Sequence, residues 1–165
     1  MLDVPADRPA LREVHEALTG RFPDSVLGGA FEKGELTEAI RAGDLLPVLR
    51  FLKSEQGFSC LEDVIVLDNL RAPEPAAARF TIFYNLYRFP GDVRVRLAVD
   101  VGEDERPDSV VAVYRSADWA EREAFDMFGL RFRGHPDLRR VYLPDDFDGH
   151  PLRKDFPLEG KGHGL

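Results

Sequence analysis

Apolar residues follow two periods along the first 130 residues, and these periods predict helices and strands. A spacing of three or four positions, as in Leu11, Val14 and Leu18, predicts a helix over residues 7–19. The same spacing predicts a second helix over residues 44–54. Each helix would bury one apolar stripe and leave its other face in water.

Strands are predicted where apolar and polar residues alternate, or where an apolar run is bounded by turn residues. The predicted strands cover residues 25–31, 35–41, 61–70, 80–87 and 93–101. Because Pro90-Gly91 marks a hairpin turn between the last two, we expect them to pair antiparallel. The run Val64-Ile65-Val66-Leu67 predicts a strand that is buried on both sides. A short helix is expected over residues 110–114.

The order of these elements predicts an α+β fold. A helix, two strands, a helix, three strands and further helices follow one another, which favours helices packed on a mainly antiparallel sheet. We therefore expect one α+β domain over residues 1–130 and an extended C-terminal arm over residues 131–165.

The helix before the arm is predicted from Asp118, its capping residue, to Gly129, which ends it. Glu121 can close a variant of the capping box with Asp118. It also lies on the apolar side of the helix, so the alternative is a partly buried carboxylate paired with an arginine of the arm. The polar side carries Trp119, Arg122, Glu123 and Asp126. On that side Arg122 and Asp126 are one turn apart and can form an ion pair.

The arm has no sustained helical or strand period. Four prolines interrupt it, and charges of both signs alternate with single large apolar residues up to Leu158. It is too apolar and aromatic for a solvated disordered tail. The composition instead indicates an extended segment that lies on its own sheet or on another protein, because arginine and aromatic residues are enriched at interfaces.

Charge and cysteine content restrict the class of protein. The 165 residues carry a net charge of −8, which disfavours a nucleic-acid partner. No apolar run reaches the roughly 20 residues needed to cross a bilayer, and the N-terminus does not resemble a signal peptide. Membrane contact is therefore expected only through other proteins. The single cysteine, Cys60, cannot hold an iron–sulfur cluster, suits a cytoplasmic protein and is expected to be buried.

Two histidines are the candidates for chemistry in the arm. His135 and His150 lie near four aspartates, and imidazole with carboxylate can bind a divalent metal, so a metal-dependent hydrolase is one alternative. Each histidine precedes a proline in a Gly-His-Pro turn, however, where its ring more often bonds a backbone carbonyl or a carboxylate. We therefore predict no catalytic, cofactor-binding or metal-binding residue on this chain.

The arm and the helix before it carry a set of motifs that resemble a known family. The motifs are Glu121-Arg122-Glu123, Asp126-Met127-Phe128-Gly129, Gly134-His135-Pro136-Asp137-Leu138-Arg139-Arg140 and the run from Gly149 to Leu158. Together they resemble the signature of the C subunit of the proton-pumping NADH-quinone oxidoreductase, respiratory complex I. Related subunits occur in membrane-bound nickel-iron hydrogenases, which is the second alternative.

The resemblance implies a non-catalytic subunit of the peripheral arm, on the cytoplasmic face of the cell membrane. It implies that flavin, iron–sulfur clusters and quinone are bound by partner subunits, and that this chain packs against the quinone-site subunit. The residues assigned to partner binding or to the structural motif are Glu121, Arg122, Glu123, Asp126, His135, Asp137, Arg139, Arg140, His150, Arg153, Lys154 and Asp155.

The arginines of the arm have two interpretations. They can form a solvated face, or Arg139, Arg140 and Arg153 can make bidentate bonds to carboxylates of this chain or of a neighbour. The resemblance favours bound arginines. Because the partner of a removed arginine would be left unpaired, we expect Arg139→Ala and Arg153→Ala to weaken assembly more than folding.

Overall fold

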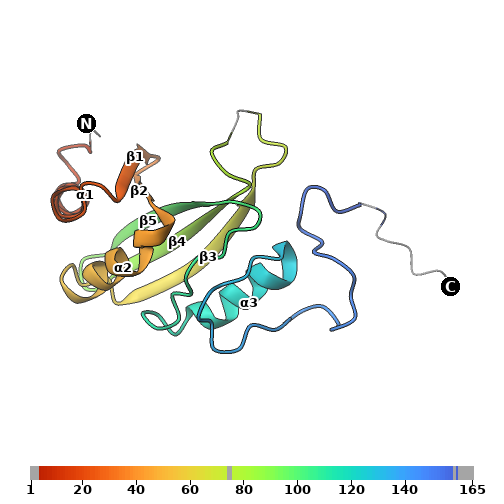
Figure 1. Cartoon of the computed structure of the whole chain (residues 1–165). Coiled ribbons are helices and arrows are strands. Elements are labelled where there is room, and N and C mark those ends of the chain that lie inside the picture. Colours follow the sequence, from red (N-terminus) through yellow and green to blue (C-terminus); the bar gives the residue numbers. More distant parts are fainter. Residues whose placement is uncertain (1–3, 74–75, 158, 160–165) are drawn as a thin grey trace.

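A five-stranded sheet with helices on one face makes up most of the molecule (Figure 1). The computed structural model of the chain describes residues 4–73, 76–157 and 159. Its elements are α1 (Pro9–Arg21), β1 (Val26–Glu32), β2 (Glu35–Ile40), α2 (Leu45–Ser54), β3 (Cys60–Asp68), β4 (Phe80–Arg88), β5 (Val93–Val101) and α3 (Ala117–Phe128). A short 3-10 turn, Ala42–Asp44, leads into α2. The predicted order of helices and strands is confirmed.

The strands lie in the order β1-β2-β5-β4-β3. All neighbours pair antiparallel except β2 and β5, which pair parallel over residues 36–39 and 95–98. The β4–β5 hairpin keeps an unbroken register from Phe80–Val101 to Arg88–Val93. The prediction of an α+β fold with a mainly antiparallel sheet is therefore correct.

The hydrophobic core lies between the sheet and its helices. Alternate residues of β5, from Val93 to Val101, are at most 6% exposed and belong to the same core cluster as the apolar stripe of α1. Each such side chain contributes about 1.5–3 kcal/mol by leaving water. A side-chain hydrogen bond also ties α1 to β2, with the Nδ1 of His15 2.6 Å from the Oε1 of the buried Glu38.

Strand β3 differs from the prediction of burial on both sides. Ile65 is 45% exposed and Leu67 is 47% exposed, while Leu61 and Val64 are buried. The physical reason is that the helices cover one face of the sheet, so an edge strand buries only one of its two sides. Cys60, at the start of this strand, is exposed, and the prediction that it is buried is also wrong.

The short helix predicted over residues 110–114 is a single turn. The amides of Val113 and Tyr114 both donate to the carbonyl of Val110, and the chain then turns into α3. The hydroxyl of Tyr114 donates to the carbonyl of Phe58 at 2.7 Å. A hydrogen bond to a residue far away in the sequence thus stabilises a single turn at a place where the sequence pattern predicts a continued helix.

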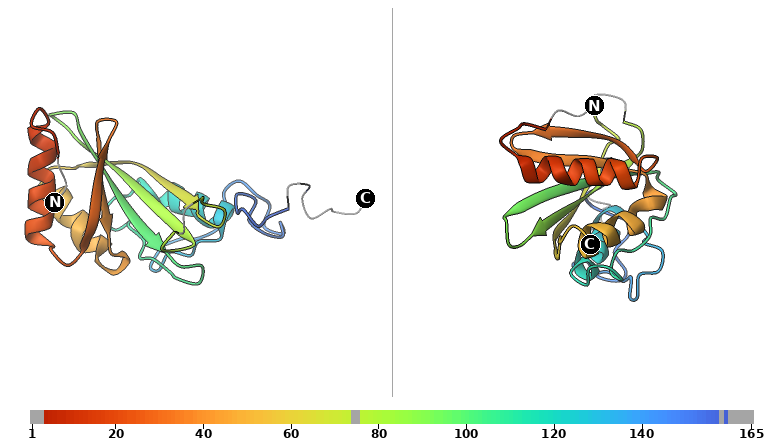
Figure 2. Two further views of the ribbon diagram at one scale, coloured as in Figure 1. Left: turned by 90° about the horizontal axis from the view of Figure 1, so that it is seen from above. Right: turned by 90° about the vertical axis from the view of Figure 1, so that its left-hand side faces the viewer.

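Residues 130–157 continue from α3 without forming a helix or a strand of their own. A single bridge joins Arg133 to Asp108. The segment doubles back along α3, at the end of the molecule opposite α1 (Figure 2). We call residues 131–157 the arm from here on; Leu158 and residues 160–165 of the predicted arm lie outside the described residues.

Candidate partner-binding site

Asp126 on α3 is the centre of the contacts between the helix and the arm. Its side chain is fully buried, and its Oδ1 binds the Nη1 of Arg140 at 2.6 Å. Its Oδ2 accepts the backbone amides of Val141, Tyr142 and Leu143 at 2.8–3.0 Å. Burial alone would raise the pKa of Asp126, but these donors hold it below its ordinary value. An ionised, fully bonded carboxylate therefore fixes the arm on the helix.

Arg140 closes the arm into a loop. Besides Asp126, its guanidinium donates to the carbonyls of Phe147 at 2.9 Å and Gly149 at 3.1 Å. Arg122 does not pair with Asp126 as predicted, but donates to the carbonyls of Arg139 and Arg140. The pairing prediction is wrong because the arm covers that side of α3 and supplies closer partners.

Glu121 is fully buried between α3 and the sheet. Its Oε1 accepts the amide of Val110 at 2.7 Å, so it neither closes a capping box nor pairs with an arginine, and both interpretations are wrong in that respect. Its Oε2 has no hydrogen-bond partner among the described residues and lies 3.9 Å from the Nε2 of His135. Burial raises the pKa of Glu121 to about 7, against the opposing effects of the Ser109 side chain and the Val110 amide.

Both histidines of the Gly-His-Pro turns use ring nitrogens for backbone groups, as predicted. The Nδ1 of His135 accepts the amide of Asp137 at 3.0 Å, and its Nε2 lies 3.3 Å from the carbonyl of Asp118. The Nδ1 of His150 donates to the carbonyl of Asp126 at 2.9 Å. These bonds hold the two turns against opposite ends of α3.

Gly129 explains how His150 can lie so close to the helix end. Gly129 ends α3 in the left-handed conformation, with a φ of 81°. A Cβ at this position would lie 2.7 Å from the Cδ2 of His150. The glycine is therefore required both by the backbone conformation and by the approach of the imidazole ring.

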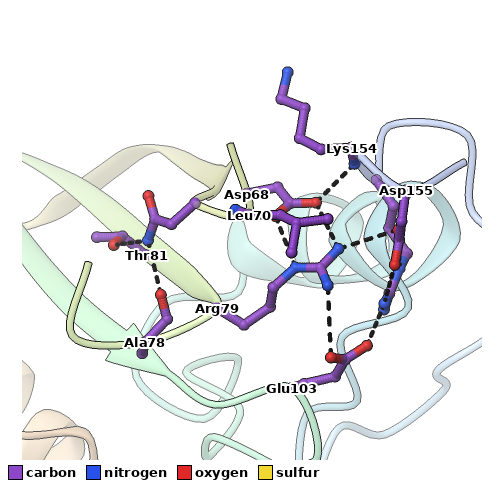
Figure 3. A network of polar contacts seen from close by, with 10 residues as sticks. Asp68, Leu70, Ala78, Arg79, Thr81, Glu103, Lys154 and Asp155 are labelled. Atoms are coloured by element: carbon purple, nitrogen blue, oxygen red, sulfur yellow. Dashed lines mark hydrogen bonds and ion pairs between the residues drawn. The ribbon is translucent and has the colours of Figure 1, made fainter. Parts of the chain in front are cut away.

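A second set of polar contacts fastens the end of the arm to the sheet (Figure 3). Arg79 binds Asp68 through two parallel bonds of 2.8 and 3.0 Å and reaches Asp155 of the arm at 3.1 Å. The backbone amide of Lys154 also donates to Asp68 at 2.8 Å, while its side chain points away from the network. Carboxylates of β3 and the arm thus share one arginine.

Arg153 joins this network from the arm. Its Nε lies 3.0 Å from Asp155, and it also bonds Glu103 in the loop after β5. The hydrogen bond from Arg153, and then that from Arg79, hold the pKa of Asp155 far below its ordinary value. The carboxylate partners predicted for Arg140 and Arg153 are therefore found within this chain.

The remaining predicted residues face solvent. Arg139, whose side chain is 69% exposed, pairs with Asp137 at 3.0 Å, and Glu123 is exposed on α3. The sequence interpretation missed two other exposed residues, Trp119 of α3 and Tyr142 of the arm, whose rings meet edge to face. The signal for them was available, since large aromatic residues on a polar helix side or in an extended segment are typical of interfaces.

Arg79, Asp68 and Glu103 were also missed, and no local pattern identifies them. Arg79 directly precedes β4, Asp68 ends β3 and Glu103 lies in a loop, and only the folded sheet brings them to the end of the arm. Among the described residues, no group of three or more His, Cys, Asp and Glu side chains is arranged to hold a metal ion. The site is an ordered segment with bonded charges and exposed aromatic rings, which suits binding of a protein surface.

A family model and individual related sequences place the chain in the same protein family. Residues 39–162 match the family described as respiratory-chain NADH dehydrogenase, 30 Kd subunit. The C subunit of NADH-quinone oxidoreductase from Trichlorobacter lovleyi is 44% identical over 89% of this chain and 90% of its own length. The corresponding C subunit from Geotalea uraniireducens is 39% identical over 97% of this chain and 93% of its own length.

Solved structures agree with these sequences. A trypsin-resistant fragment of Nqo5 is 31% identical and superposes with a TM-score of 0.70, over 78% of this chain and 99% of the fragment. A chain of the archaeal membrane-bound sulfane sulfur reductase, 21% identical over 89% of this chain and 85% of its own length, shares the fold with a TM-score of 0.74.

The comparisons confirm the resemblance first seen in the motifs of α3 and the arm. Those motifs lie within the matched residues 39–162. None of the described helices has the length and apolar character that crossing a bilayer requires. The chain belongs to the family of the 30-kilodalton subunit of respiratory-chain NADH dehydrogenase, which includes the C subunits of bacterial NADH-quinone oxidoreductases.

Proposed function

We propose that the chain is a non-catalytic structural subunit in the peripheral arm of an NADH-quinone oxidoreductase. It supports electron transfer from NADH to quinone by holding the quinone-site subunit in place. It carries no cofactor, and flavin, iron–sulfur clusters and quinone are bound by partner subunits. It lies on the cytoplasmic face of the cell membrane and is attached there through the other subunits of the complex.

The observation that carries this proposal is the way the arm is held. Asp126 accepts three consecutive arm amides, and the Asp68–Arg79 pair binds the far end, so an otherwise irregular segment has a defined path. The arm exposes the side chain of Tyr142 within the first fixed region and that of Leu152 just before the second. A segment that is ordered but leaves large apolar side chains in water is suited to cover another protein.

The boundary at residue 130 is part of this proposal. The trypsin-resistant fragment of Nqo5 covers 78% of this chain, so a protease-resistant fragment is known for a protein that shares this fold. Resistance to a protease is expected of a compact sheet domain, whereas cleavage is expected in an irregular segment whose partner is absent. On this proposal the arm is the part that depends on a neighbouring subunit.

The equivalent subunit of another membrane complex, such as a membrane-bound hydrogenase, is the alternative. This alternative is supported by the fold that the chain shares with a chain of the sulfane sulfur reductase, which is another membrane-bound complex. Purification of the native complex decides between them by the presence or absence of NADH oxidation. The metal-dependent hydrolase gains no support from the structure, because His135 and His150 face the backbone.

Hydrogen exchange tests the proposal on the isolated chain and on the chain in its complex. We expect the amides of residues 141–143, bonded to Asp126, to be protected in both states. The amides of Phe147, Leu152, Arg153, Lys154 and Phe156 are bonded within the chain and are excluded from the comparison, whereas the remaining amides of residues 144–157 should become protected only in the complex. Equal exchange of that segment in both states would contradict a partner-covered arm.

A further inference from the structure

Trp119 and Tyr142 form an exposed aromatic pair beside the buried polar contacts of the site. Trp119 is 53% exposed on α3 and Tyr142 is 59% exposed on the arm. Their ring centroids are 6.2 Å apart at an interplanar angle of 87°, and the indole Nε1 donates to the Tyr142 hydroxyl at 3.3 Å. Large rings in such a position expose apolar surface that a monomeric domain would otherwise bury.

The pair is fixed in place before any partner binds. The guanidinium of Arg122 lies 5.3 Å from the Trp119 ring and bonds the carbonyls of Arg139 and Arg140 on the arm. The backbone amide of Tyr142 is bonded to the buried Asp126 at 2.8 Å. Because the rings are already held, their binding to a partner would cost little conformational entropy.

The hydrogen-bonding groups beside the rings indicate the chemistry of the partner. The Tyr142 hydroxyl accepts a bond from Trp119, so its own proton is free to be donated. Arg139, three residues before Tyr142, engages Asp137 through Nε, and its side chain is 69% exposed. The pair therefore combines apolar surface with donors, and its complement is an apolar side chain flanked by carboxylate or carbonyl oxygens.

A second copy of this chain does not fit that description. A symmetric contact through the aromatic pair would bring the same donors, Tyr142 and Arg139, against each other. A different chain can present acceptor oxygens to these donors without bringing two Arg139 guanidinium groups together. Among the other cations of the arm, Arg133, Arg140 and Arg153 are engaged by carboxylates of this chain.

We propose that Trp119 and Tyr142 are the anchor through which the chain binds the quinone-site subunit, on a surface where that subunit presents an apolar side chain beside acceptor oxygens. This inference rests on the proposed function, and it names the residues that carry the contact. The motif residues of the arm hold the anchor in position, while the two rings supply the binding energy.

The test is the affinity of the full chain for the purified quinone-site subunit. Trp119→Ala and Tyr142→Ala should each weaken binding by about 30-fold or more, as expected for interface hot spots, with little change in Tm. Tyr142→Phe, which removes only the hydroxyl, should weaken binding about fivefold. Leu27→Ala is the matched control, because Leu27 is a large exposed residue on β1, away from α3, and its loss should leave binding unchanged.

Wild-type affinity in both alanine variants would overturn the anchor while leaving the proposed function intact. A wild-type chain that does not bind the subunit would instead overturn the proposed function. Should an alanine variant melt early as well as bind weakly, fluorotryptophan labelling decides, since Trp119 is the single tryptophan of the chain. Its fluorine resonance must shift when the unlabelled subunit binds; an unchanged resonance in the complex would refute the inference.

Discussion

The buried carboxyl of Glu121 offers a quantitative test of the site, through the substitution Glu121→Gln. The amide keeps the size of the side chain and the oxygen that accepts the Val110 amide. It removes the ability to ionise in a place where Oε2 has no described partner and where the Tyr84 hydroxyl is likewise buried without one. His135 and Asp118 are the other titratable groups beside it.

The size of the effect follows from the pKa. Burial, with a smaller contribution from Asp118, raises the pKa of Glu121 from 4.5 to about 7 in the folded chain. At about 1.4 kcal/mol for each tenfold change in proton affinity, this corresponds to about 3 kcal/mol. A raised pKa means that the folded state binds the proton more tightly than the unfolded state. The contribution of protonated Glu121 to the free energy of unfolding is therefore complete below pH 4.5 and is lost as the pH rises to about 7.

The assay is denaturant unfolding of the wild-type chain and the Glu121→Gln variant across this pH range. We expect similar stabilities near pH 4.5, and a variant that is more stable by about 3 kcal/mol above pH 7. The difference between the two chains cancels the titrating groups that do not interact with residue 121. A difference that does not change with pH would refute the reasoning, and so would a variant that is less stable than the wild-type chain at high pH.

Three further substitutions test the contacts of the arm. Both Gly129 and Gly134 have a positive φ, so replacing either with alanine should cost about 1–2 kcal/mol of stability. Gly129→Ala should cost more than Gly134→Ala, because of the two only Gly129 lies against a neighbouring ring. Equal Tm values for the two variants would contradict this. Asp126→Asn should cost about 3 kcal/mol in denaturant unfolding, because it leaves buried donors unpaired; a cost near zero would argue against the buried pair. Arg153→Ala should reduce the free energy of unfolding by about 2 kcal/mol and so lower Tm, whereas Arg139→Ala removes only an exposed pair and should leave Tm unchanged. A larger decrease in Tm for Arg139→Ala than for Arg153→Ala would show that the network around Arg153 is not formed in solution.

The sheet could be predicted because its signals are local. Alternating apolar residues in β5 and the turn at Pro90-Gly91 fix both strands of the central hairpin, and one face of each must meet a core. The same argument failed at β3, where Val64-Ile65-Val66-Leu67 fits a strand buried on either one or two sides. Which faces are covered depends on how many helices lie over the sheet, and no short segment carries that information.

The site could be located from the sequence, but its internal pairing could not. A helical projection places Asp126 on the polar side of α3 and therefore predicts solvent around it. The arm lies over that side and brings donors from 14 to 17 residues further along the chain. The bond from Lys154 to Asp68 spans 86 residues, so only the folded sheet brings the two together. Tertiary contacts, rather than the helical period, decide which carboxylates are buried.

These pairings change how the family motif is interpreted. Residues such as Asp126, Arg140 and His150 are bonded to their own chain, which explains why charged residues occur in a segment without regular structure. An arm with such a path behaves as a rigid edge rather than a flexible tail. A rigid edge can place the edge-to-face pair of Trp119 and Tyr142 at a defined distance from the sheet. If the charged residues themselves made the interface, their partners would lie on the neighbouring subunit, whereas Arg140 and Arg153 already bond carboxylates of this chain.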